Sequence, residues 1–167
     1  SSSGRGWANL SNAPFRMYKR YTHEGGVSTP LIVHWPAGLK GKGELRHAPS
    51  HLIDVAPTCL AAAGLSGKGM EGKSLLPVFA KDSKKERTLY WEHEGNRAVR
   101  KGNYKLVAMY ETPWELYDMS KDRSELKDLS STMPKKATEL LTMYETWAKR
   151  VGALPWNEVN VKKKKKK

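Results

Sequence analysis

Four short segments rich in aromatic and β-branched side chains lie between residues 88 and 118, and they constrain the fold more than any other feature of the sequence. Each has the length and composition of a β-strand, and short stretches containing Gly, Asn or Pro separate them. Strands joined in this way pair with their neighbours in antiparallel order. We therefore expect a four-stranded antiparallel meander with strands at residues 88–92, 96–100, 104–109 and 115–118.

An amphipathic helix is expected after this meander. Pro134 suits the first turn of a helix, and apolar side chains then recur at helical spacing as far as Val151. Gly152 follows at the position of a C-cap. The apolar face should pack on the sheet, so residues 81–158 are expected to form a small subdomain of antiparallel sheet and C-terminal helix.

The sequence before residue 80 has a different character. The polar stretch up to residue 29 predicts an ordered loop, and the apolar run at residues 31–35 predicts a buried strand. Residues 51–63 carry apolar side chains near helical spacing and predict a buried helix with Cys59 in its core. A change of subdomain is therefore expected near residue 80.

The positive charge is concentrated at the C-terminus. The chain has 30 Lys and Arg against 17 Asp and Glu, a net charge of +13, and the run Lys162–Lys167 supplies six of these positive charges. Such a run attracts polyanions without specificity, so a basic polyanion- or nucleic-acid-binding module is one alternative. No stretch approaches the roughly 18 consecutive apolar residues of a membrane span, and we expect no membrane partner.

The strongest local pattern for a binding site is Lys19 followed by Glu24-Gly25-Gly26. A cation on an ordered loop beside a strand end is well placed to hold an anion, and paired glycines allow close backbone approach. From composition alone, a solvated lysine and glycines that merely turn the chain are the simpler explanation.

The order of the motifs resembles the second half of the type I sulfatases, over roughly residues 5–156. The matching segments are Lys19, Glu24-Gly25-Gly26, Pro30, Trp35-Pro36, His51–Thr58, Ala62-Ala63-Gly64, Trp91–Arg100, Tyr104–Val107 and Trp114–Asp118. The resemblance implies an α/β fold in which residues 1–80 end an alkaline-phosphatase-like α/β sandwich. The small subdomain, a four-stranded antiparallel sheet packed on a C-terminal helix, then occupies residues 81–158, and a lysine-rich tail occupies residues 159–167.

The resemblance also implies the site residues. Lys19 matches the family lysine that contacts the sulfate ester, which gives it a catalytic role. His23 is a candidate for substrate binding, and so are three residues of the segment 92–97 that could line the mouth of the pocket: His93, Asn96 and Arg97. A hairpin whose charged side chains face solvent is the alternative for that segment.

The catalytic nucleophile of the family is absent from this chain. Sulfatases make formylglycine from the Cys or Ser of a Cys/Ser-x-Pro/Ala-x-Arg motif, beside a calcium ion, whereas Cys59 is followed by Leu60-Ala61-Ala62. The nucleophile and the calcium ligands are therefore expected in a missing N-terminal half, and this chain alone should be inactive. The spacing of His47, His51 and Asp54 only superficially suits a metal, so we expect no metal site here.

The expected substrate is a sulfate-ester small molecule or a sulfated carbohydrate. A phosphoesterase of the same superfamily is an alternative, since it would share the fold and an anion-binding lysine. Because many relatives are exported, the resemblance also implies a periplasmic or secreted parent protein.

Overall fold

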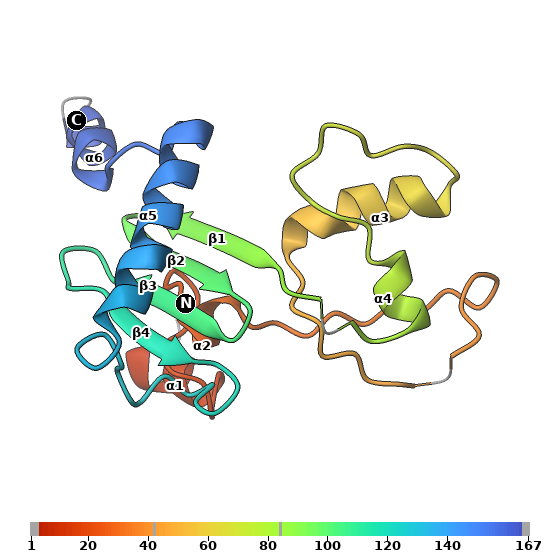
Figure 1. The fold of residues 1–167 in the computed structure, drawn as a ribbon, viewed down its shortest axis with the longest axis horizontal. Helices are drawn as coiled ribbons and strands as arrows, with labels where there is room; N and C mark the ends of the chain where they lie inside the picture. The colour runs from red at the N-terminus through yellow and green to blue at the C-terminus, as the bar shows by residue number, and fades with distance from the viewer. Residues whose placement is uncertain (1–3, 42, 84, 165–167) are drawn as a thin grey trace. The chain divides into compact units, whose positions relative to one another are not determined.

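A computed structural model describes residues 4–41, 43–83 and 85–164 of the chain, with side chains up to residue 160. The chain divides into two compact units (Figure 1). One unit combines the residues up to Thr29 with those from Thr88 onward, and the other is Pro30–Arg87. The segment before residue 30 thus packs with the C-terminal sheet. The expected boundaries at residues 80 and 158 stay predictions.

The first unit is built on the expected antiparallel meander. Its strands pair only with their neighbours along the chain, in the order β1-β2-β3-β4 (Figure 1). The observed ends differ from the sequence prediction by one residue at most. The strands are β1 Thr88–His93, β2 Asn96–Lys101, β3 Tyr104–Ala108 and β4 Glu115–Asp118.

The turn between β1 and β2 is tight. Both of its residues have positive φ angles, 52° at Glu94 and 82° at Gly95, as a hairpin turn that follows the sheet twist requires. A Cβ atom at Gly95 would lie 2.4 Å from the ring of Tyr110 and 3.0 Å from Cβ of Trp156. Only glycine allows this turn to pack so closely against those two residues.

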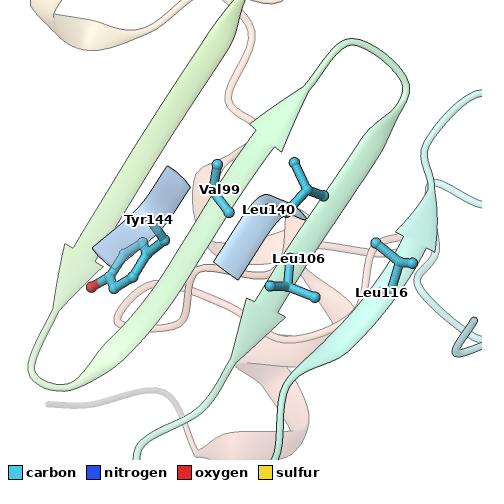
Figure 2. Close-up of a cluster of buried hydrophobic side chains, with 5 residues drawn as sticks. All are labelled: Val99, Leu106, Leu116, Leu140 and Tyr144. Atoms are coloured by element: carbon cyan, nitrogen blue, oxygen red, sulfur yellow. The ribbon is translucent and has the colours of Figure 1, made fainter. Parts of the chain in front are cut away.

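Helix α5, Pro134–Val151, covers one face of the sheet, as predicted. Val99, Leu106 and Leu116 of the sheet pack against Leu140 and Tyr144 of the helix in a buried cluster (Figure 2). Each such side chain stabilises the fold by roughly 1.5–3 kcal/mol when fully buried. The helix ends at Gly152, whose φ of 71° is that of a left-handed C-cap.

Side chains of residues 15–28 contact the opposite face of the sheet, where Arg16 and His23 bind Glu115 and Glu24 binds Lys105. A smaller cluster lies there, made by Ala98, Val107, Tyr117 and Met119 with Trp91 packed against it. The expected loop before residue 30 is ordered, but it also contains two short helices, α1 (Arg5–Leu10) and α2 (Glu24–Val27). A further helix, α6 (Trp156–Lys164), follows α5.

The second unit departs from the sequence prediction. Its described residues contain no strand, and the expected buried strand at 31–35 is an exposed extended segment in which Ile32 is 90% exposed. An apolar extended segment forms a strand only where another strand accepts its backbone hydrogen bonds. The described part of this unit provides no such neighbour, so the strand prediction is wrong for this chain.

The helix expected at residues 51–63 forms, but it is largely exposed. A short 3-10 helix η1 (Leu52–Asp54) leads into α3 (Val55–Ala62), and α4 (Leu76–Ala80) follows. Only Pro57 and Thr58 of α3 are buried, and Cys59 is exposed. The predictions of a buried helix and a core cysteine are therefore wrong, because α3 turns its apolar Cys59 face outward.

Candidate functional site

Lys19 lies at the tip of a sharply turned loop in the first unit. Its ammonium group forms no hydrogen bond or ion pair with any residue that the structure describes, and its side chain is exposed. Two neighbours have left-handed backbone conformations, with φ of 68° at Met17 and 92° at Arg20. Such conformations are uncommon for residues other than glycine and need support from the surrounding structure.

The paired glycines supply part of this support. A Cβ atom at Gly25 would lie 2.1 Å from the carbonyl oxygen of Met17, and one at Gly26 would lie 2.0 Å from that of Tyr21. The backbone N–H of Gly25 donates to the carbonyl of Arg16 at 2.9 Å. No other residue type fits at these two positions, so the Gly-Gly pair fixes the loop that carries Lys19.

A buried ion cluster anchors the same segment to the sheet. The Lys105 ammonium lies 3.2 Å from Glu24 and 2.8 Å from Glu125, and all three side chains are buried. The Glu24 N–H donates to the Glu125 carboxylate at 2.8 Å, and Arg123 donates to Glu24 at 3.1 Å. Burial raises the pKa of Glu24, but Lys105 and Arg123 outweigh it and hold this pKa below its usual value. Glu24 thus fixes the loop.

A second polar cluster surrounds His23, which is completely buried. Its Nε2 lies 3.1 Å from the Glu115 carboxylate, which also accepts hydrogen bonds from Arg16 at 3.1 Å and from the Tyr117 hydroxyl at 3.0 Å. Burial lowers the pKa of His23. The imidazole therefore stabilises the loop through its contact with Glu115. Its expected contact with a substrate stays a prediction.

The hairpin between β1 and β2 touches the Lys19 loop. The side-chain amide of Asn96 donates to the carbonyl of Arg20 at 3.2 Å and to that of His93 at 3.0 Å. Arg20 also pairs with Glu94 at 2.6 Å. Asn96 is buried and His93 is exposed, so the structure brings both of these candidates close to the loop.

Arg97 is separated from the other candidates. Alternate residues of a strand point to opposite faces, and Arg97 shares the face of Val99 that packs on α5. Its guanidinium lies over the ring of Trp114, 4.7 Å from the centroid. Lys19, His93 and Asn96 therefore lie on one side of the sheet and Arg97 on the other, and a substrate contact by Arg97 stays a prediction.

Most of the residues that hold this site could not be identified from the sequence. Lys105 had a recognisable signal, since a charged residue stands inside the apolar strand segment Tyr104–Val107. Glu125 and Glu115 had none, because their partners lie far away along the chain. Glu24 and Glu125 are 101 positions apart.

Two of the three residues with superficial metal spacing have side chains engaged with other partners. Asp54 is buried, accepts hydrogen bonds from both terminal nitrogens of Arg87 at 2.5 and 2.6 Å, and accepts another from the backbone N–H of Lys73. Nδ1 of His51 accepts from the backbone N–H of Ile53. Across the described ranges, no group of three or more His, Cys, Asp or Glu side chains is arranged to hold a metal ion. The described residues therefore do not fit a calcium site.

Comparisons with known proteins agree on one family. Residues 15–146 match the family described as N-sulphoglucosamine sulphohydrolase, C-terminal. An uncharacterized sulfatase of Schizosaccharomyces pombe is 30% identical over 90% of this chain and 30% of its own length. N-acetylgalactosamine-6-sulfatase of Mus musculus is 32% identical over 67% of this chain and 22% of its own length.

Solved structures show the same relationship. The crystal structure of Ps i-CgsB is 26% identical to this chain, covers 84% of it with 34% of its own length, and has a TM-score of 0.71. A structure of the same protein in complex with k-i-k-neocarrahexaose has a TM-score of 0.70 at 25% identity. The chain thus spans about a third or less of the length of these relatives. No helix in the described part of the chain is long and apolar enough to cross a bilayer.

Proposed function

Because the chain belongs to the sulfatase family of N-sulphoglucosamine sulphohydrolase C-terminal regions and has the corresponding α/β fold, we propose that it supplies the sulfate-binding lysine and part of the substrate pocket of a sulfuric-ester hydrolase. Lys19 is the residue to which we assign the sulfate contact. Its exposed ammonium stands on a loop that glycines, an ion cluster and Asn96 hold in place, and this observation carries the proposal.

The chemistry of sulfate esters suits this arrangement. Hydrolysis places negative charge on the sulfuryl and leaving-group oxygens in the transition state, and a fixed cation lowers the energy of that state without having to reorganise. Asn96 acts in this proposal as a positioning residue, since it binds the carbonyl of Arg20 next to Lys19. His93 stands exposed at the same hairpin, where it can contact the leaving group.

A sulfated carbohydrate is the proposed substrate class. The complex of Ps i-CgsB with a neocarrahexaose and the name N-acetylgalactosamine-6-sulfatase both associate relatives with sugars. Sulfate esters of other small molecules carry the same reacting group, and we include them as a second class of substrate. A phosphoesterase would also use an anion-binding lysine, and the assay below separates the two activities.

We further propose that the formylglycine nucleophile and the calcium ion lie in the N-terminal half of the parent protein, and that the parent protein is exported to the periplasm or secreted. The roles that we propose for residues of this chain do not involve the metal ion. The partner of this chain is that N-terminal half, and the exposed apolar side chains of the second unit provide a surface for it. Ile32 is 90%, Leu52 83% and Leu45 78% exposed, and we assign these side chains to that interaction.

The test is an assay of the full-length parent protein. We expect it to release sulfate from an activated aryl sulfate and from sulfated oligosaccharides, with a much lower kcat/KM on the matching aryl phosphate. The isolated 167-residue chain should show no turnover. Preference for the phosphate ester would contradict the proposal, and so would sulfatase activity of the isolated chain that disappears in Cys59→Ala.

A further inference from the structure

A hollow of about 410 Å³ opens on the α5 side of the sheet, away from Lys19. It lies between the β1–β2 hairpin, the loop after β3 and the connection from α5 to α6. The side chains that matter for its chemistry are those of Glu92, Arg97, Tyr110, Glu111, Tyr144 and Trp156. Its volume falls within the range of small-molecule sites, roughly 300–1,000 Å³.

Two polar atoms at the hollow have no hydrogen-bond partner among the described residues. The Tyr144 side chain is 5% exposed, yet its hydroxyl forms no hydrogen bond there, and Figure 2 shows the hydroxyl at the outer end of the ring. Nε of Arg97 is likewise buried without a partner. Arg97 and Glu92 are directly opposite each other on β1 and β2, yet no ion pair joins them among the residues that the structure describes. Buried polar groups are normally hydrogen-bonded, so these groups indicate a polar ligand.

The Tyr144 hydroxyl is available as a donor at any physiological pH. Burial and the nearby Glu92 carboxylate raise the pKa of Tyr144 to about 12. One carboxylate oxygen of Glu92 accepts from the backbone N–H of Gly95 at 2.9 Å, and the other remains to accept from a ligand. The hollow therefore offers both donors and acceptors, as a molecule with several hydroxyl groups requires.

Two aromatic side chains form walls of the hollow. Tyr110 is 37% exposed, and both Tyr110 and Trp156 lie against Gly95, which keeps the hairpin turn close to them. An aromatic ring offers an apolar surface to a C–H face, while the polar groups bind hydroxyls at the edge. This combination suits a pyranose ring.

The charges at the hollow decide which pyranose fits. Glu92 and Glu111 contribute two negative charges and Arg97 one positive charge, so the lining is net negative and disfavours a sulfate group. We propose that this hollow is a second carbohydrate-binding site, which takes an unsulfated pyranose. The sheet separates it from Lys19, so it is independent of the sulfate-binding site.

Titration of the nitrogen-labelled 167-residue chain with methyl glycosides tests this site. The probes are the methyl β-glycosides of galactose, glucose and N-acetylglucosamine, each compared with its sulfate ester at the primary hydroxyl. We expect shifts of the Trp156 indole signal with a Kd of about 1 mM for at least one unsulfated probe, the affinity expected from ordinary ligand efficiency. The sulfated form of that probe should bind at least fivefold more weakly.

Two variants and one control make the result specific. Tyr144→Phe keeps the buried ring and removes the hydroxyl, so it should fold and weaken binding of the unsulfated probe at least threefold. Glu111→Gln removes an exposed negative charge, so it should fold and bring the affinity for the sulfated probe closer to that for the unsulfated one. Lys19→Ala should leave this binding unchanged even though the proposed function makes it essential for hydrolysis. The proposal is overturned if no unsulfated probe binds below 20 mM, if Tyr144→Phe binds as the unchanged chain does, or if the sulfated probes bind better.

Discussion

The Lys105 ammonium lies 2.8 Å from the Glu125 carboxylate, and neither side chain has any exposed surface. Lys105 stands on β3, whereas Glu125 stands on the loop after β4 and accepts the backbone N–H of Glu24. One buried cation thus connects the sheet to the segment that carries Lys19. Buried charges are tolerated only when they are paired and hydrogen-bonded, so this cluster makes the loop depend on the sheet.

Removal of the cation should therefore destabilise the first unit. Lys105→Ala leaves Glu24 and Glu125 buried side by side, and we expect the free energy of unfolding to fall by about 3–5 kcal/mol. Urea unfolding of the chain, followed by Trp fluorescence, measures this change. Lys127→Ala, at an exposed lysine with no ion pair among the described residues, is the control. Equal stability of the two variants would contradict the account.

Stability should fall as the pH decreases through the usual titration range of histidine. Burial lowers the pKa of His23 from 6.5, and Lys105 and Arg16 act in the same direction, while Glu115 and Glu125 oppose them. The unfolded chain takes up a proton near pH 6.5 that the folded chain does not, so His23 costs stability below that pH. An NMR titration of the imidazole should give a midpoint below 6.5. A midpoint above 6.5 would contradict this prediction, because it would show that Glu115 and Glu125 raise the pKa of His23 by more than burial lowers it.

The second unit should depend on Asp54 in a similar way. Its carboxylate binds Arg87 and the backbone N–H groups of His51 and Lys73, so Asp54→Asn removes the charge from a fully buried hub. We expect amide hydrogen exchange in α3 to become at least tenfold faster, while exchange in the sheet is unchanged. Glu86→Gln, an exposed neighbour of Arg87, is the matched control. Unchanged protection of α3 in Asp54→Asn would show that the charge of the Asp54 carboxylate does not stabilise the second unit.

The lysine tail should supply most of the affinity for polyanions. This prediction concerns Lys162–Lys167, which lie outside the described side chains, and rests on their charge. Each neutralised phosphate contributes roughly 0.9 to the slope of log K against log salt for B-DNA. Chains with and without residues 162–167 should therefore differ in this slope on duplex DNA. An identical slope would place the affinity in the body of the chain and favour the polyanion-binding alternative.

The sheet and α5 could be predicted because short-range patterns specify them. Alternating apolar residues, turn residues and the Pro134 and Gly152 signals are contained within a few positions each, and the observed strands and helix follow them closely. The strand at 31–35 failed because its formation depends on a neighbouring strand. The sequence pattern shows that the segment is apolar, but it carries no information about what accepts its hydrogen bonds.

The candidate site could be predicted only in part. The Glu24-Gly25-Gly26 motif indicated a tight loop beside Lys19, and the structure shows why both glycines are required. The braces of that loop could not be predicted, because Glu115, Glu125 and Arg16 meet only after the chain has folded. The position of Arg97 followed from strand alternation, which assigns it to the face opposite Asn96 and could have been used from the start.

Kinetics of Lys19 variants in the full-length parent protein test the central claim most directly. We expect Lys19→Ala to lower kcat/KM for a sulfate ester by on the order of a hundredfold or more, since one preorganised contact to developing charge commonly contributes this much. Lys19→Arg should recover little, because a planar guanidinium does not place its charge at the same point. The Tm of both variants should match that of the unchanged enzyme, and Lys127→Ala should retain full activity. Unchanged kcat/KM in Lys19→Ala would contradict the account, since it would show that this ammonium does not act on the sulfate.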